Sequence, residues 1–128
     1  MEEITMNVSW LGVIAGAVVA FLLGWLWYSP RLFGKQWAAG LGVELGDASE
    51  MPMGAMGLQA LGLLLMSWFV GVTAASNALL TVILATVAFT VLGYAGGMFG
   101  KQASAVRNIN AGYWLVSLLV MFACQAIF

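Results

Sequence analysis

The sequence predicts an all-α integral membrane protein built as a four-transmembrane-helix bundle. Hydrophobic residues make up 63% of the chain and charged residues only 7%, whereas about a quarter of the residues of soluble domains are charged. Long stretches carry no charge at all, and 128 residues leave room for about four spans of ~20 residues each. We therefore expect residues 1–128 to form a single transmembrane domain.

The first helix is expected over residues 8–28, because no charged residue occurs between Ile4 and Pro30. At about 1.5 Å per residue this stretch covers a hydrocarbon core of roughly 30 Å. Asn7 or Ser9 is expected to cap its start. Small residues recur at every fourth position of this helix: Gly12, Gly16, Ala20 and Gly24. Such a smooth strip favours close packing of a neighbouring helix over a substrate path.

Aromatic residues and Pro30 mark the end of this helix, since proline disfavours helical geometry in the residue before it. The following residues mix apolar and cationic side chains, which indicates a short segment lying on the membrane surface. Aromatic rings and cations of this corner and of two later regions are expected to anchor the chain at the membrane interface. These residues are Trp27, Tyr28, Arg31, Lys35, Trp37, Lys101, Tyr113 and Trp114.

Three acidic residues, Glu44, Asp47 and Glu50, follow the surface segment. Three spaced acidic residues are compatible with a cation site or with a solvated loop. Their spacing does not match an EF-hand loop, so we interpret them as a solvated loop and expect no metal.

The second and third helices are expected over residues 56–75 and 78–98, because residues 51–100 contain no charge. The small and polar residues around Asn77 predict a tight turn between them. On the third helix, Thr86, Thr90, Gly93 and Gly97 share one face, which suggests a second packing stripe at Gly93 and Gly97. Polar side chains in these helices could line a route for a solute or bond to a neighbouring helix. The candidate polar lining is Gln59, Ser67, Thr86, Thr90 and Ser117.

The fourth helix is expected over residues 111–127, after a connector at residues 99–110 that contains Lys101 and Arg107. Asn108 or Asn110 would cap its start. Cys124 is expected to be a structural thiol, because no basic residue near it in the sequence would lower its pKa.

All four cationic residues fall in the loops after the first and third helices. Cytoplasmic loops of membrane proteins are enriched in Lys and Arg. With four spans, we therefore expect a multi-pass protein whose two termini lie outside the cytoplasm.

A short sequence occurs twice with variation. Residues 19–25 read VAFLLGW and residues 87–94 read VAFTVLGY, and each is followed by FGKQ. This suggests two hairpins related by duplication as a parallel repeat. Chance similarity in so biased a composition is the alternative.

The chain resembles a family of bacterial membrane proteins catalogued as a domain of unknown function, with four predicted spans. The matching segments are residues 7–10, the corner LWYSPRLFGK at residues 26–35 with Trp37 after it, and INAGYWL at residues 109–115. The resemblance covers essentially the full length. It implies an α-helical protein of the bacterial inner (plasma) membrane and supplies no catalytic or ligand-binding residue.

Composition narrows the possible functions. The sequence has no histidine, and its charged residues all fall in expected tails or loops, so acid–base catalysis in the membrane lacks suitable groups. We therefore expect no enzyme, no cofactor and no metal, and the net charge of −1 gives no support for nucleic-acid binding. Two hypotheses remain: permeation or transport of an uncharged small solute, and an oligomeric membrane scaffold or accessory protein. Membrane lipid and further copies of the chain are the expected partners.

Overall fold

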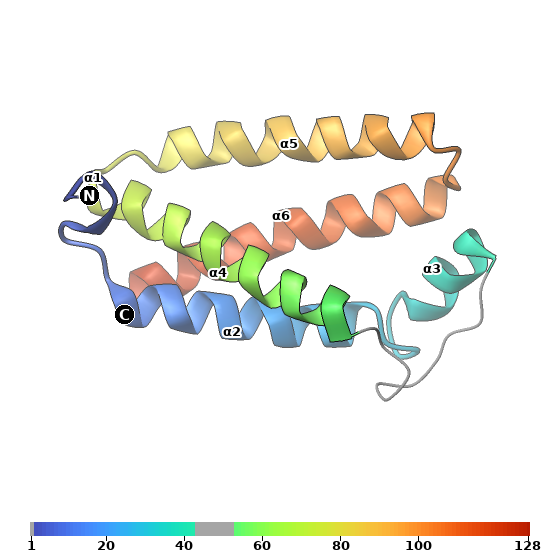
Figure 1. The fold of residues 1–128 in the computed structure, drawn as a ribbon, viewed down its shortest axis with the longest axis horizontal. Coiled ribbons are helices and arrows are strands. Elements are labelled where there is room, and N and C mark those ends of the chain that lie inside the picture. Colours follow the sequence, from blue (N-terminus) through green and yellow to red (C-terminus); the bar gives the residue numbers. More distant parts are fainter. Residues whose placement is uncertain (1, 43–52) are drawn as a thin grey trace.

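The computed structural model describes residues 2–42 and 53–128, which form helices and no strands within these ranges. The helices are α1 (Glu2–Thr5), α2 (Trp10–Trp27), α3 (Gly34–Leu41), α4 (Met53–Ala75), α5 (Leu79–Phe99) and α6 (Ser104–Ile127) (Figure 1). Four of them, α2, α4, α5 and α6, are long and apolar enough to cross a membrane. The predicted all-α, four-span bundle is therefore confirmed. The acidic residues Glu44, Asp47 and Glu50 lie outside the described residues.

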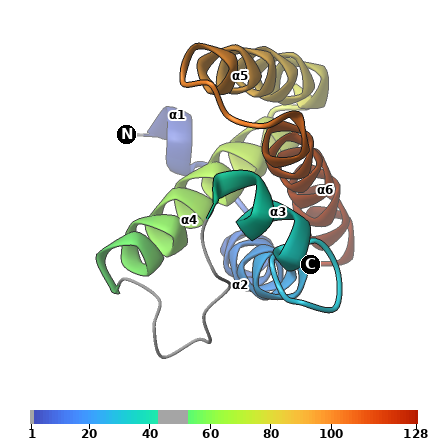
Figure 2. The same cartoon turned by 90° about the vertical axis from the view of Figure 1, so that its right-hand side faces the viewer.

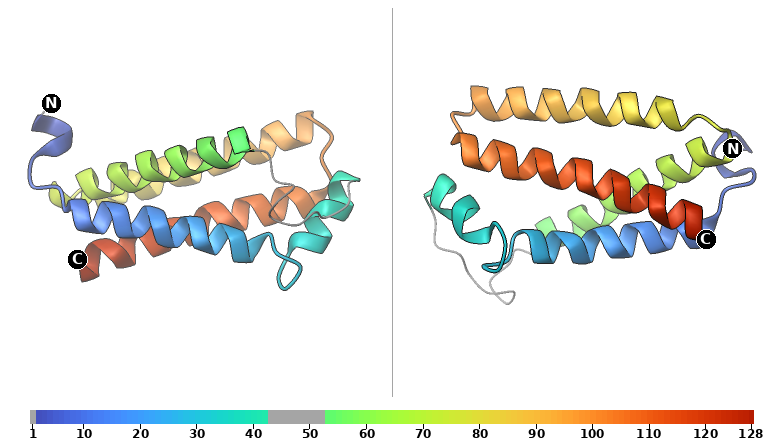
Figure 3. Two further views of the ribbon diagram at one scale, coloured as in Figure 1. Left: turned by 60° about the horizontal axis from the view of Figure 1, so that its bottom comes forward. Right: turned by 180° about the vertical axis from the view of Figure 1, so that it is seen from behind.

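The four long helices run in alternating directions along the chain (Figures 1 and 3). Helix α2 packs against both α4 and α6, whereas α5 packs mainly against α6 and lies away from α2 (Figure 2). The short helix α3 packs against α6 at the end of the bundle where α2 finishes. Both termini lie at the opposite end of the bundle (Figure 1).

Helix α2 begins at a serine cap. The Ser9 hydroxyl accepts a hydrogen bond from the Gly12 amide at 3.2 Å, which satisfies one of the free donors at the start of the helix. Ser9, and not Asn7, is thus the cap, and Asn7 instead has a left-handed backbone with φ 61°.

The corner after α2 folds tightly because a glycine occupies its inner side. The Gly34 amide donates to Ser29 O at 2.9 Å, and the Phe33 amide donates to Trp27 O at 3.1 Å. A Cβ atom at Gly34 would collide with the backbone of Tyr28 and Ser29. The short segment predicted to lie on the membrane surface forms a helix, α3, which is attached to the bundle through this corner.

The two FGKQ segments end up in different structures. Gly34 opens helix α3, whereas Gly100 caps the end of α5. The hairpins are therefore not equivalent at this point, and a duplication stays a prediction.

The last helix is longer than the sequence predicts. Helix α6 begins at Ser104, so most of the expected connector at residues 99–110 is helical and the predicted start at residue 111 is wrong. Asn108 and Asn110 do not cap the helix, because their side-chain oxygens accept hydrogen bonds from tyrosine and tryptophan side chains of other helices or of the corner. Asparagine disfavours helix interiors by competing for local backbone groups, and this competition is removed when its side chain bonds elsewhere.

One face of α6 contributes more buried residues to the core than any other described helix. Its buried residues recur at helical spacing: Val106, Ile109, Tyr113, Ser117, Leu118, Met121 and Cys124. They meet buried residues of the other long helices, including Ala20, Val70 and Val82. The outer faces of the bundle are largely leucine, isoleucine and valine, as expected for surfaces that contact lipid tails.

Candidate functional site

The corner after α2 is held to α6 by three side-chain hydrogen bonds. The Tyr28 hydroxyl donates to Asn110 Oδ1 at 2.7 Å, and the Trp37 indole donates to the same oxygen at 3.2 Å. The Trp27 indole donates to Ile109 O at 3.0 Å. The two most specific sequence motifs, at residues 26–35 and 109–115, thus meet at one end of the bundle. We call these five residues the corner lock.

The Tyr28 hydroxyl in this lock is poorly accessible to water. Burial raises the pKa of Tyr28 well above its ordinary value of 10.0, and the nearby Tyr113 adds to the rise. The hydroxyl is therefore held neutral and serves as a hydrogen-bond donor. The polar atoms of Trp27, Tyr28 and Trp37 donate their hydrogen bonds to α6. The predicted role of these residues as anchors in the lipid headgroups stays a prediction.

Tyr113 was expected at the membrane interface, but the structure places it inside the bundle with 1% of its surface exposed. Its hydroxyl donates to Ala20 O at 2.7 Å. A Cβ atom at Gly24 would lie 2.7 Å from this hydroxyl, so Gly24 leaves the space through which Tyr113 reaches α2. The sequence does not reveal that the Tyr113 hydroxyl bonds to a backbone carbonyl of α2. The only signal for this contact is Gly24, which lets another helix approach α2 closely.

At the same end, α5 and α6 are joined by Tyr94 and Arg107. The Arg107 guanidinium carbon lies 5.0 Å from the Tyr94 ring centre, and the Tyr94 hydroxyl donates to Asn108 Oδ1 at 3.0 Å. A Cβ atom at Gly97 would lie 3.0 Å from the Arg107 stem. The cationic residues Arg31, Lys35 and Lys101 are exposed, and their role as interface anchors stays a prediction.

The small residues of α2 differ from those of α5 in what they contact. Gly12, Gly16 and Ala20 are buried, and a Cβ atom at Gly16 would lie 2.6 Å from Ser67 Oγ of α4. By contrast, Gly93 is exposed and nothing lies within 4 Å of the position of its Cβ. The structure therefore does not support Gly93 as a packing residue within the chain.

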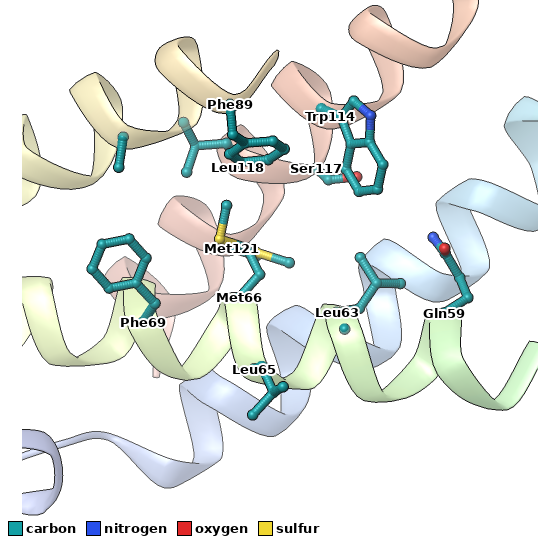
Figure 4. Close-up of a pocket in the computed structure, with 12 residues that line it drawn as sticks. Gln59, Leu63, Leu65, Met66, Phe69, Phe89, Trp114, Ser117, Leu118 and Met121 are labelled. Atoms are coloured by element: carbon teal, nitrogen blue, oxygen red, sulfur yellow. The ribbon is translucent and has the colours of Figure 1, made fainter. Parts of the chain in front are cut away.

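A groove lies between α4, α5 and α6, with a volume of about 460 Å³ (Figure 4). Its walls include three aromatic side chains, Phe69, Phe89 and Trp114, and the thioethers of Met66 and Met121. Phe89 and Trp114 contact edge to face with their ring centres 5.7 Å apart. Trp114, predicted to lie in the membrane interface, thus forms part of the groove wall. We call this cavity the α4–α5–α6 groove.

Two of the predicted polar lining residues, Gln59 and Ser117, border the groove. Figure 4 shows them toward one end of the groove, with Phe69 toward the other. Both lie close enough to Tyr113 to interact electrostatically with its hydroxyl oxygen, although Ser117 Oγ makes no hydrogen bond of ordinary geometry and is buried. The groove therefore has an apolar body and one polar end.

The other predicted lining residues lie elsewhere. Ser67 is buried between α4 and α2, where its hydroxyl donates to Val13 O at 2.7 Å. Thr86 and Thr90 are buried on α5 and do not border the groove, and their hydroxyls have no hydrogen-bond partner. The five residues therefore do not line one continuous polar route.

Within residues 2–42 and 53–128, no three His, Cys, Asp or Glu side chains come together as metal ligands would. Cys124 is a free, buried thiol in α6. The described residues that line the groove carry no charged side chain.

Four long apolar helices, three of which border a largely apolar groove, define a small membrane-embedded protein. The chain belongs to the family described as protein of unknown function DUF1761, whose model matches residues 11–125. This confirms the resemblance to a family of unknown function that the corner and INAGYWL motifs indicated. No curated protein and no solved structure matches the chain.

Proposed function

We propose that the protein binds an uncharged, weakly polar small molecule in the α4–α5–α6 groove and carries it into or across the membrane. The groove itself is the observation that supports this proposal. Its volume of about 460 Å³ falls in the range of roughly 300–1,000 Å³ typical of ligand sites. A mostly apolar wall with a few polar groups is also typical of such sites.

The ligand is expected to enter from the lipid. The groove lies between helices whose outer surfaces are apolar, and its border includes the half-exposed Leu65 of α4. An uncharged ligand fits best because a charged one would lack a counter-charge in the wall. For the same reason we propose neither proton coupling through the groove nor an enzymatic reaction that needs a titratable group or a cofactor.

The proposed location is the bacterial inner membrane, with the corner lock on the cytoplasmic side and both termini outside. All four cationic residues belong to the segments 31–35 and 101–107, which the fold brings to one end of the bundle (Figure 1). This distribution supports the orientation through the enrichment of Lys and Arg in cytoplasmic loops.

An oligomeric scaffold is the second candidate function, and one observation favours it. Gly54, Gly57 and Gly62 of α4 are exposed, and no atom of the described part of the chain lies within 4 Å of their Cβ positions. Exposed small residues let transmembrane helices of two chains approach closely. In this case a second copy, rather than a small molecule, would cover the groove.

Photolabelling with benzophenone tests the proposal. This uncharged, lipid-soluble ketone inserts into nearby C–H bonds when irradiated, and peptide mass spectrometry locates the adducts. In vesicles containing the protein, we expect more adduct at Met66 and Met121 than at Met98. Met98 is 57% exposed on the outer face of α5, so it reports labelling from probe dissolved in the lipid.

A matched pair of glycine variants supplies the control. Gly62 borders the groove and Gly57 does not, although both are open positions on α4. Gly62→Leu should fill the groove and reduce the Met66 and Met121 adducts to the Met98 level, while Gly57→Leu should leave them unchanged. If the amount of adduct at each methionine depends only on its surface exposure, in the wild type and in both variants, the groove is not a ligand site. Self-association of the protein in detergent that is lost in Gly62→Leu but kept in Gly57→Leu, without excess adducts at Met66 and Met121, would instead support the scaffold.

A further inference from the structure

The polar end of the α4–α5–α6 groove is the feature from which a ligand class follows. Gln59 is half-buried there. Its side chain and that of the buried Ser117 both lie close to the hydroxyl of the buried Tyr113. The Gln59 carboxamide is an accessible polar group of the wall, whereas Ser117 Oγ is buried. A carboxamide has two N–H donors and one acceptor oxygen.

This amide has more hydrogen-bonding capacity than its protein neighbours use. The Tyr113 hydroxyl already donates to Ala20 O at 2.7 Å, so it offers Gln59 only its oxygen as an acceptor. A Gln59 N–H that donates to this oxygen leaves the amide a second N–H donor, on a residue that borders the groove. Lipid tails cannot accept a hydrogen bond, so an unpaired amide donor in this position is costly unless a ligand or water pairs with it.

Resting on the proposed function, we infer that the ligand has an apolar body and one hydrogen-bond acceptor, such as a ketone, ester or amide carbonyl, which accepts from Gln59. The body lies along the aromatic and thioether wall formed by Phe89, Met66 and Met121. The acceptor lies at the Gln59 end, and the apolar part points toward Phe69 (Figure 4). An uncharged hydrocarbon of the same shape fits the wall equally well but leaves the Gln59 donor unpaired.

Competition between two matched compounds tests this inference. Dicyclohexyl ketone and dicyclohexylmethane have the same rings and differ in the carbonyl. Each is added to the vesicles at increasing mole fraction in the lipid, and the loss of benzophenone adducts at Met66 and Met121 is measured. The ketone can accept a hydrogen bond from Gln59 and the hydrocarbon cannot. We therefore expect the ketone to compete at a mole fraction roughly three- to tenfold lower than that of the hydrocarbon.

Two variants separate the role of Gln59 from general effects on the fold. In Gln59→Leu, which keeps the bulk but removes the amide, the ketone should lose its advantage and the two competitors should become equal. Ser67→Ala is the matched control, because it removes a buried hydroxyl of the same helix that does not border the groove. It should keep the full advantage of the ketone.

The outcomes distinguish this inference from the function it rests on. If both compounds compete equally with the wild-type protein, or if the advantage of the ketone survives in Gln59→Leu, the inference is wrong while the groove remains a ligand site. If benzophenone does not label the groove at all, both the inference and the proposed function fail.

Discussion

Replacing Gly16 by alanine should destabilise the bundle, although alanine is the better helix former. The new Cβ atom would lie 2.6 Å from Ser67 Oγ, which is too close, so the Ser67 side chain must move and give up its 2.7 Å hydrogen bond to Val13 O. Overpacking costs about 1–3 kcal/mol and the lost hydrogen bond about 0.6–1.7 kcal/mol, against a propensity gain of up to about 1 kcal/mol. We expect a net loss of roughly 1–3 kcal/mol.

The neighbour that causes this loss can be removed separately. In a Ser67→Ala background the nearest remaining atoms to the new Cβ are those of Met121, at 3.4 and 3.5 Å, which is ordinary contact. Gly16→Ala should then be neutral or stabilising by up to about 1 kcal/mol. Gly93→Ala is the control in the wild-type background, because the space around Gly93 is open.

The assay is unfolding by titration with sodium dodecyl sulfate in mixed micelles, followed by circular dichroism and analysed as a double-mutant cycle. A coupling free energy of at least about 1 kcal/mol between Gly16 and Ser67 is expected, as for residues in contact. Equal effects of Gly16→Ala in the two backgrounds, or equal effects of Gly16→Ala and Gly93→Ala, would refute the close contact between α2 and α4.

Three further predictions concern the corner lock and the orientation of the chain. Asn110→Ala removes the acceptor of both Tyr28 and Trp37 and should lower the free energy of unfolding by about 1–3 kcal/mol. Asn108→Ala should cost less, because Asn108 and its hydrogen bond to Tyr94 are exposed. Equal losses in the same titration would count against the lock. Since the pKa of Tyr28 is raised in the fold, the neutral hydroxyl is favoured there, so stability should be constant below about pH 9 and fall as the pH rises above about 10. Tyr28→Phe should reduce this alkaline slope, and tyrosinate absorbance should show one fewer late-titrating tyrosine in the variant than in the wild type. An epitope tag after Phe128 should be reachable by antibody from outside intact cells, and a tag reachable only after permeabilisation would reverse the orientation.

The sequence predicts the parts of the fold that depend on hydropathy, and it does not predict the parts that depend on contacts between distant residues. The four spans are marked by long uncharged stretches, so their existence and approximate positions follow from hydropathy alone. The start of α6 at Ser104 does not follow, because Asn108 and Asn110 favour caps unless their side chains bond to distant residues. The helix α3 was missed for a related reason, since Gly34 weakens a helix locally but is required by the tight corner.

The residues of the α4–α5–α6 groove were likewise predicted only in part. Gln59 and Ser117 were among the predicted polar lining residues because polar side chains are rare in membrane spans. Their separation from Ser67, Thr86 and Thr90 depends on which helix each residue faces, and helix rotation is not encoded in hydropathy. Trp114 was assigned to the interface by its residue type, although the packing of α5 against α6 turns it toward the groove.

Helix α6 contacts α2, α3, α4 and α5, and it is the last of these helices to be synthesised. The bundle therefore cannot complete its packing while the earlier helices are being inserted into the bilayer. Until α6 arrives, Asn110 is absent, and the aromatic side chains of the corner have no acceptor on the protein. Complete assembly is thus expected to wait for the final helix. In a chain interrupted before Ser104, α2 could already pack against α4, but α5 and α3 would lack the helix against which they mainly pack.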